Sequence, residues 1–191
     1  ELTKCVLHSP HCVLFVEVYG REASTYTIVA SLDVVDSGLA IDSPSSLARN
    51  YVFSSAAFGP SLPVLAMTAQ VVVASPWNDN GCHPFSADNA AELKGKIALI
   101  SRGTCYFVEK TSHAEAAGAV AVIIVNNAAD GVVTMATHGS QVVNITTVMV
   151  SHEDGVAIKA TLQDSGEMVT ATLHEPTTRP TRLFDGMPQE F

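Results

Sequence analysis

The stretch that decides the fold is residues 95–127, GKIALISRGTCYFVEKTSHAEAAGAVAVIIVNN. Residues 97–100 form a short apolar run between Gly95 and Gly103, and residues 119–125 form a second run that is rich in β-branched Val and Ile. Short apolar runs bounded by turn residues are typical of buried strands. The sequence therefore predicts two buried strands with a connecting segment between them.

The connecting segment has the pattern of a helix. Residues 108–117 contain Glu, Lys and Ala, which favour helices, and Gly118 stands where a helix C-terminus takes a left-handed residue. Two strands joined through a helix are most simply parallel, because a tight hairpin cannot make that connection. This predicts a parallel crossover whose first loop, residues 102–105, lies at the C-terminal end of its strand.

The same residues resemble the protease-associated (PA) domain family. The recurring signature of this family is a GKIAL strand, an RG-x-C-x-F-x-x-K turn and helix, and an AGA-x-AVI-x-x-NN segment, found here at residues 95–99, 102–110 and 117–127. With flanking matches, the likeness covers residues 43–173. The resemblance implies an α/β (α+β) fold, a mixed β-sheet or open β-barrel with flanking helices and one parallel βαβ crossover.

We expect four regions along the chain. Residues 1–33 are predicted to form a β-strand pair, which either resembles part of a pre-peptidase β-sandwich or adds to the PA sheet. Residues 34–46, with Asp, Ser, Gly and Pro, are predicted to be a linker. The PA domain is expected over residues 47–174 and a C-terminal connector over residues 175–191. Within the PA domain, residues 75–89 are predicted to form a loop.

Composition excludes several classes of protein. Hydrophobic residues make up 47% of the 191 residues and charged residues only 15%, so the chain is predicted to fold rather than stay disordered. The formal net charge is -9 and no basic stripe occurs, which argues against nucleic acid and anionic membranes as partners. No apolar run approaches the roughly 20 residues that span a bilayer. The chain begins at Glu1 without Met, so we expect a processed or excised piece.

The four cysteines form two groups. The family resemblance implies a disulfide between Cys82 and Cys105. Cys5 and Cys12 enclose two histidines in CVLHSPHC, and a local disulfide, a zinc site with cramped spacing and free thiols all stay open for them. The even cysteine count and the sequon at Asn144 predict glycosylation and a secreted or lumenal location.

No catalytic residue, metal or cofactor is predicted. A Gly-x-Ser-x-Gly elbow and a His-Glu-x-x-His motif are both missing from the sequence. Cys105 is expected to be paired, and Glu109 and Glu115, six residues apart on a helix, point to different faces.

A binding site is predicted at the turn that contains Arg102. Its guanidinium is expected beside unpaired backbone N–H groups at the following helix N-terminus, where carboxylates and peptide carbonyls bind. The resemblance to plant vacuolar sorting receptors implies that this arginine helps to hold a peptide ligand, with further contacts from the loop after the double Asn. The candidate ligand-binding residues are Arg102, Gly103, Thr104, Asn126, Asn127, Thr134, Met135 and His138.

Each candidate has a plainer alternative. Arg102 is alternatively a structural ion-pair partner of Asp130 or Glu109, and Lys110 of the same motif is expected to be a solvated helix residue. Asn126 and Asn127 alternatively end their strand and form its turn. His138 is either an exposed loop residue or a pH-sensitive contact.

The sequence thus predicts a non-catalytic domain that binds protein or peptide segments for substrate or cargo recognition. The alternative is an accessory domain that gates substrate in a larger secreted peptidase, subtilisin-like or zinc-dependent.

Overall fold

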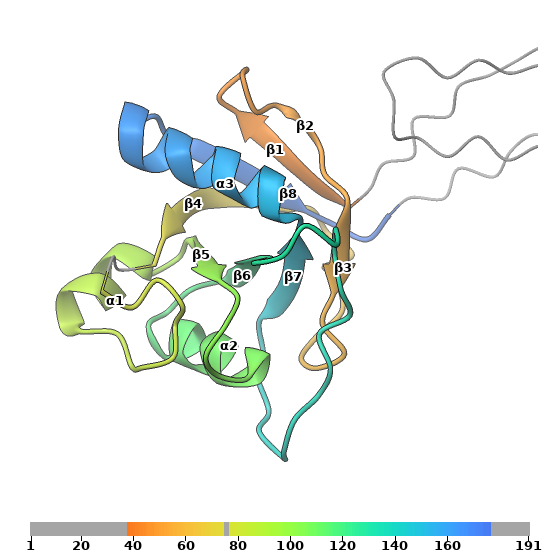
Figure 1. The fold of residues 1–191 in the computed structure, drawn as a ribbon, viewed down its shortest axis with the longest axis vertical. Helices are drawn as coiled ribbons and strands as arrows, with labels where there is room; N and C mark the ends of the chain where they lie inside the picture. Colours follow the sequence, from red (N-terminus) through yellow and green to blue (C-terminus); the bar gives the residue numbers. More distant parts are fainter. Residues whose placement is uncertain (1–37, 75–76, 177–191) are drawn as a thin grey trace, which may run out of the picture. The chain divides into compact units, whose positions relative to one another are not determined.

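The computed structural model describes residues 38–74 and 77–176 (Figure 1). The chain divides into a unit of residues 1–34 and a unit of residues 35–191, and every described residue belongs to the second unit. The strand pair predicted over residues 1–33, the cysteines Cys5 and Cys12, and residues 177–191 of the predicted connector lie outside the described residues.

One curled mixed sheet organises the described unit. Its strands run in the order β2-β1-β8-β4-β5-β6-β7-β3. The strands are β1 (Leu39–Ser43), β2 (Arg49–Asn50), β3 (Phe53–Ser55), β4 (Met67–Val73), β5 (Ile97–Ser101), β6 (Ala121–Val125), β7 (Thr146–Val150) and β8 (Val169–Leu173). The helices are α1 (Ala87–Leu93), α2 (Phe107–Ala116) and α3 (His152–Ala160), which continues into the π-helical turn η1 (Thr161–Ser165).

The centre of the sheet is parallel. Neighbouring strands from β4 to β7 run in the same direction. β5 pairs with β6 in the register Ile97↔Ala121, and helix α2 connects the two strands along the chain. The predicted mixed fold with a parallel β-α-β unit is therefore confirmed. The outer strands β1, β2, β3 and β8 pair antiparallel.

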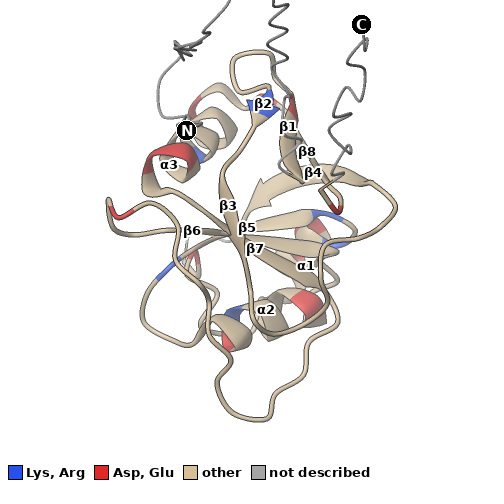
Figure 2. Cartoon of the chain, turned by 90° about the vertical axis from the view of Figure 1, so that its right-hand side faces the viewer, with Lys and Arg blue, Asp and Glu red and all other residues tan. Residues whose placement is uncertain are grey.

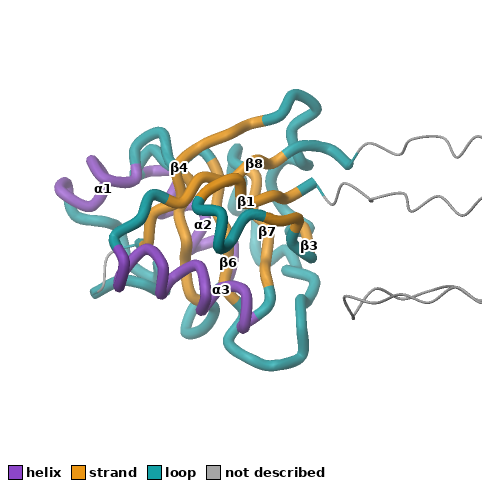
Figure 3. Tube along the Cα trace, turned by 90° about the horizontal axis from the view of Figure 1, so that it is seen from above, coloured by secondary structure: helices purple, strands orange, loops and turns teal. Residues whose placement is uncertain are grey.

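The parallel strands are apolar on both faces because helices cover both faces. One face, with Ile97, Leu99 and Ile123, packs in a core that includes Ile158 of α3. The other face, with Ala98 and Ile100, packs in a second core with residues of α1 and α2. Figures 1 and 3 show α3 on one side of the sheet and α2 on the other. Continuous rather than alternating apolar runs are what such a two-sided strand requires.

Gly155 lets α3 lie directly on the sheet. A Cβ atom placed on Gly155 would be 2.2 Å from Cγ1 of Val125, which is far closer than two carbon atoms can approach. The helix and the strand therefore fit together only because this position has no side chain.

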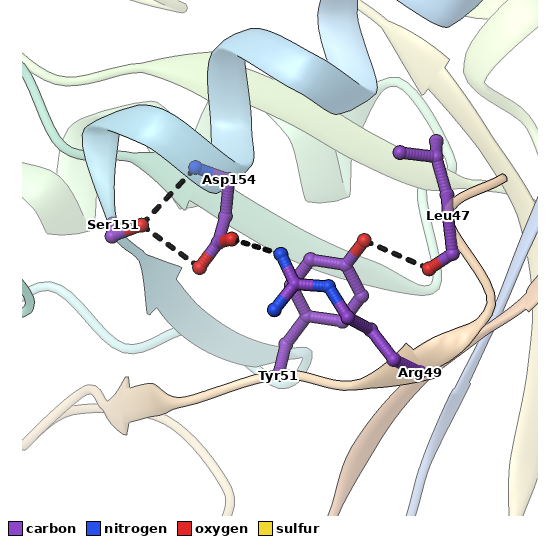
Figure 4. Close-up of polar contacts among 5 residues, drawn as sticks. All are labelled: Leu47, Arg49, Tyr51, Ser151 and Asp154. Carbon is purple, nitrogen blue, oxygen red and sulfur yellow. Dashed lines mark hydrogen bonds and ion pairs between the residues drawn. The ribbon is translucent and has the colours of Figure 1, made fainter. Parts of the chain in front are cut away.

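A polar network joins the segment around β2 to the start of α3 (Figure 4). Arg49 forms an ion pair with Asp154 and lies over the ring of Tyr51, with its Cζ 4.2 Å from the ring centroid. Ser151 caps α3, since its Oγ accepts a hydrogen bond from the backbone N–H of Asp154. The Tyr51 hydroxyl donates to the carbonyl of Leu47. This network holds the first strands of the unit against α3.

Two predictions of local structure are wrong. The linker predicted over residues 34–46 contains β1, which pairs with both β2 and β8. Leu39 and Ile41 are buried with one residue between them, an alternation that the Ser, Asp and Pro content of the segment concealed. The loop predicted over residues 75–89 ends in the start of α1, whose N-cap is Ser86.

The close approach at Gly155 gives a first prediction. Gly155→Ala should lower the free energy of unfolding by about 1–3 kcal/mol, because an added methyl group must displace Val125 or the helix. Denaturant unfolding followed by circular dichroism measures this. Val156→Ala, on the exposed side of the same turn, is the matched control and should change stability by less than about 0.5 kcal/mol. Equal effects from the two substitutions would contradict the packing described here.

Candidate functional site

The candidate site lies at the C-terminal ends of the parallel strands. Residue 102 follows β5, residue 126 follows β6, and α3 begins directly after β7. Backbone contacts hold these connections together, since Arg102 N donates to the carbonyl of Val125 and Asn126 N donates to that of Val150. In open α/β sheets this end is where ligands bind, because the loops leave the strands there and their side chains converge.

The loop after β5 has an unusual backbone. Gly103 has φ +128° and Thr104 has φ +71°, and Thr104 is the one non-glycine residue with positive φ among the described residues. A β-branched residue in this region is strained, at a cost of order 1–3 kcal/mol. The surrounding structure must therefore hold the loop in place.

Lys110 is one of the groups that hold it. The prediction of a solvated lysine is wrong, because Lys110 is 0% exposed. Its Nζ donates to the carbonyl of Gly103 at 2.6 Å and to the carbonyl of Asn80, and lies 3.3 Å from Cys82 Sγ. Its position in the helix predicted a side chain exposed to solvent. The side chain instead packs against the loop and donates hydrogen bonds to backbone carbonyls that would otherwise lack a partner.

A disulfide ties the same two loops. Cys82 and Cys105 are bridged across 23 residues, so the loop before β5 is linked covalently to the loop after it. On the loop-entropy account a bridge of this span contributes about 3 kcal/mol. Ser101 adds a third link, because its backbone N donates to the carbonyl of Asp79 and its Oγ donates to Asp79 Oδ2.

Arg102 is held by an amide rather than by a carboxylate. One guanidinium nitrogen, NH1, donates to Oδ1 of Asn126 at 2.7 Å, and its Cζ lies 5.9 Å from the ring centroid of Phe107. The alternative of a direct ion pair with Asp130 or Glu109 is therefore wrong. Asn126 links Arg102 indirectly to a carboxylate, because its Nδ2 donates to Asp130 Oδ1 at 2.7 Å. No partner in the described part of the chain takes the other guanidinium N–H groups of Arg102.

Open backbone donors accompany this arginine. The backbone N–H groups of Gly103, Thr104, Tyr106 and Phe107 have no hydrogen-bond partner among the described residues. Tyr106 is the N-cap of α2 and supplies no side-chain cap, whereas Ser86 and Ser151 cap α1 and α3. Residues 102–107 line an open pocket of about 420 Å³. Free donors at a helix N-terminus favour an anionic or carbonyl oxygen.

Some of the predicted residues join this pocket. Asn127 is exposed, and its Nδ2 lies 3.7 Å from where a Cβ atom on Gly103 would stand. His138 stacks on Tyr106, with ring centroids 3.4 Å apart and planes at 14°. This contact brings the long loop after β6 to the edge of the pocket. Tyr106, half exposed, is a residue that the motif comparison did not single out, although it stands between two motif positions.

Other predicted residues have structural roles. Asn126 is 0% exposed and bonds Arg102, Asn127 N, Asp130 and Gly131, so no part of its amide is left for a ligand. Met135 is 0% exposed in the core, and its carbonyl accepts from Ala57 N. Thr134 is exposed, and no hydrogen bond in the described ranges joins it to the loop after β5.

Figure 2 marks the Lys, Arg, Asp and Glu positions of the described fold. The Lys and Arg positions are spread over several elements and form no basic stripe. The described residues contain no cluster of three or more His, Cys, Asp or Glu side chains that could hold a metal ion. Within the same residues, no helix has the length and hydropathy needed to cross a membrane.

Comparison with known proteins identifies the domain. The family described as "PA domain" matches residues 67–158, which include the whole crossover and the loop after β5. This chain contains a PA domain. The chain is similar to aminopeptidase YwaD of Bacillus subtilis, at 46% identity over 74 residues. This match covers 39% of this chain and 16% of the relative. The chain is also similar to signal peptide peptidase-like 3 of Arabidopsis thaliana, at 33% identity over 130 residues, or 67% of this chain and 23% of the relative.

A solved aminopeptidase has the same fold. The aminopeptidase from Aneurinibacillus sp. strain AM-1 matches with a TM-score of 0.55 and 30% identity, over 73% of this chain and 31% of that one. The chain thus spans less than a third of the length of these relatives. The shared part is the PA domain.

The buried lysine gives a prediction for pH. Burial lowers the pKa of Lys110 to about 8, although nearby Asp79 and Glu109 act in the opposite direction. The unfolded chain keeps this proton up to a pKa of about 10.4, so between pH 8 and pH 10 the unfolded state binds more protons. The contribution of Lys110 to the free energy of unfolding should therefore increase with pH in this window.

Denaturant unfolding at pH 7, 8 and 9 tests this. The stability of the wild type relative to Lys110→Met should grow as the pH rises, and Lys94→Met, an exposed lysine, should show no such trend. A wild-type advantage that shrinks with pH would contradict the buried position of the ammonium group.

Proposed function

We propose that this PA domain binds an extended protein or peptide segment in the pocket lined by residues 102–107 and does not cleave it. The observation that carries the proposal is the group of unpaired donors. Backbone N–H groups from the loop and the start of α2, and guanidinium N–H groups of Arg102, have no partner among the described residues, and they belong to residues that line one open pocket. Peptide carbonyls and carboxylates are the oxygen acceptors that such donors fit.

The pocket also offers an apolar and a polar wall. Tyr106 and His138 form a stacked pair on one side, and Phe107 lies under the arginine. The side-chain amide of Asn127, for which the described residues supply no hydrogen-bond partner, stands beside Gly103. A bound segment would thus meet main-chain donors in the centre and aromatic rings and an amide at the margin, which is a pattern for recognition with modest sequence selectivity.

The similarity to aminopeptidases favours a peptidase as the host of this domain. In that setting the PA domain presents a substrate segment to a catalytic domain elsewhere in the polypeptide. Cargo recognition in a receptor is the second candidate, and the same donors favour it.

Removing the guanidinium should separate binding from stability. Arg102→Ala should weaken peptide binding about 10- to 100-fold, as expected for a lost hydrogen bond to a charged group. The free energy of unfolding should fall by less than about 1 kcal/mol, because Asn126 Oδ1 still accepts from Asn127 N. The measurement is fluorescence anisotropy with labelled peptides selected from a random heptapeptide library on the wild-type domain.

Arg49→Ala is the matched control. It removes an arginine that bonds a carboxylate on α3, so it should lower stability and leave peptide binding unchanged. Undiminished binding by Arg102→Ala, or cleavage of the peptides by the purified chain, would contradict the proposed function.

We further propose that the domain acts in an oxidising compartment and carries a glycan on Asn144. The disulfide supports this, and Asn144 is exposed with its Nδ2 3.0 Å from Glu115 Oε1. Protein secreted from eukaryotic cells should lose mass on treatment with an N-glycosidase. Asn144→Gln should abolish that loss, and Thr146→Ser, which keeps the sequon, should retain it. Secreted wild-type protein of unmodified mass would overturn this proposal.

A further inference from the structure

The two ends of the described fold meet at one end of the sheet. Leu39, at the start of β1, pairs with Leu173, at the end of β8, and Leu173 also pairs with Met67, the first residue of β4. His174 N donates to the carbonyl of Gly38. Beyond them, a Cβ atom on Gly38 would lie 3.1 Å from Pro176. The chain therefore enters and leaves the domain at adjacent points.

This end of the sheet is opposite to the candidate site. Strands β4 to β7 are parallel, so they all begin at the end where Met67 lies and all finish at the end that carries the loop after β5. Because β8 runs antiparallel to β4, Leu173 lies beside the beginning of β4. Whatever is joined to either end of the described fold thus begins away from the peptide pocket.

An open pocket of about 470 Å³ lies where the chain leaves. Leu62, Glu175 and Pro176 line it, together with residues of β3 and the segment that follows. β3 is the last strand of the sheet, and the residue after it, Ala56, bridges to Met135 of the loop after β6. Ala56 N bonds to Thr147 O, and hydrogen-bonded pairs alternate along antiparallel strands, so the N–H groups of Phe53 and Ser55 point away from β7.

Exposed apolar side chains stand beside this pocket. Val64 is 80% exposed and Leu65 is 84% exposed, and the preceding Pro63 carbonyl accepts from Glu175 N. Two adjacent large aliphatic side chains so exposed, next to an open pocket, are typical of a surface that is covered in the complete assembly. We name Leu62, Val64, Leu65 and Pro176 the exit face.

We propose that the exit face packs against an apolar surface of an adjoining domain of the same polypeptide. Both ends of the described fold, Gly38 and Pro176, lie at this face, and the chain spans less than a third of the relatives named above. Aliphatic side chains of that domain fill the pocket, and Val64 and Leu65 insert into its surface. The loop after β5 stays open to a ligand, so this docking is independent of the proposed peptide binding.

Site-specific photocrosslinking in the full-length polypeptide tests the proposal. With p-benzoylphenylalanine in place of Leu65, irradiation and peptide mapping should find crosslinks to residues outside the 191-residue segment. The matched control is the same substitution at Val156, an exposed valine on α3, which should give less than about a tenth of that yield.

Other outcomes overturn the proposal. Crosslinks that join two copies would mean self-association, and crosslinks within the 191 residues would mean that the chain covers its own face. A crosslinking yield at Leu65 no higher than that at Val156 would mean that the exit face is exposed to solvent in the full-length polypeptide. Leu65→Asp in the same polypeptide should also increase proteolytic cleavage between the domains while leaving peptide binding unchanged, which separates this proposal from the function of the pocket.

Discussion

The candidate site depends on the hydrogen bonds that the buried ammonium group of Lys110 donates. This group lies fully buried and donates to the carbonyls of Asn80 and Gly103, which belong to the loops on either side of β5. The disulfide joins the same two loops through Cys82 and Cys105. Together they hold Thr104 in a backbone conformation that a free loop would leave. These contacts hold in place a loop whose backbone N–H groups at Gly103 and Thr104 have no hydrogen-bond partner among the described residues.

This arrangement supports the proposed binding of a peptide segment. A strained loop fixed by a covalent bond and a buried cation has little conformational entropy left to lose when a ligand binds. Its N–H groups are then pre-positioned donors for the oxygen atoms of a ligand. The pocket lined by residues 102–107 and the exit face lie at opposite ends of the parallel strands, so the proposed peptide binding and the proposed docking do not compete for the same surface.

Much of this fold was predictable from residues 95–127. The two apolar runs form strands that are buried on both faces, and such parallel strands have a continuous run of apolar residues. Gly118 has the left-handed φ of +85° that is expected at the end of a helix. Arg102, Gly103 and Thr104 line the pocket as predicted from the turn. Their role in binding stays a prediction.

Other features depend on tertiary contacts that a local pattern cannot show. The burial of Lys110 is set by carbonyls 7 and 30 residues away, which helical periodicity does not record. Asn126 and Met135 matched the motif, but the fold buries both. β1 is a strand only because β8 and β2 lie on either side of it. The contact between His138 and Tyr106 joins residues of different loops and follows from the course of the chain after β6.

Backbone dynamics of the loop after β5 test the central claim most directly. If Lys110 and the disulfide hold the loop rigid with open donors, ¹⁵N relaxation should give order parameters near about 0.85 for residues 103–106, similar to those of α2. The amides of Gly103 and Thr104 should nevertheless exchange rapidly with solvent. Order parameters below about 0.6 in the loop, or strong protection of these amides in the free domain, would contradict the account.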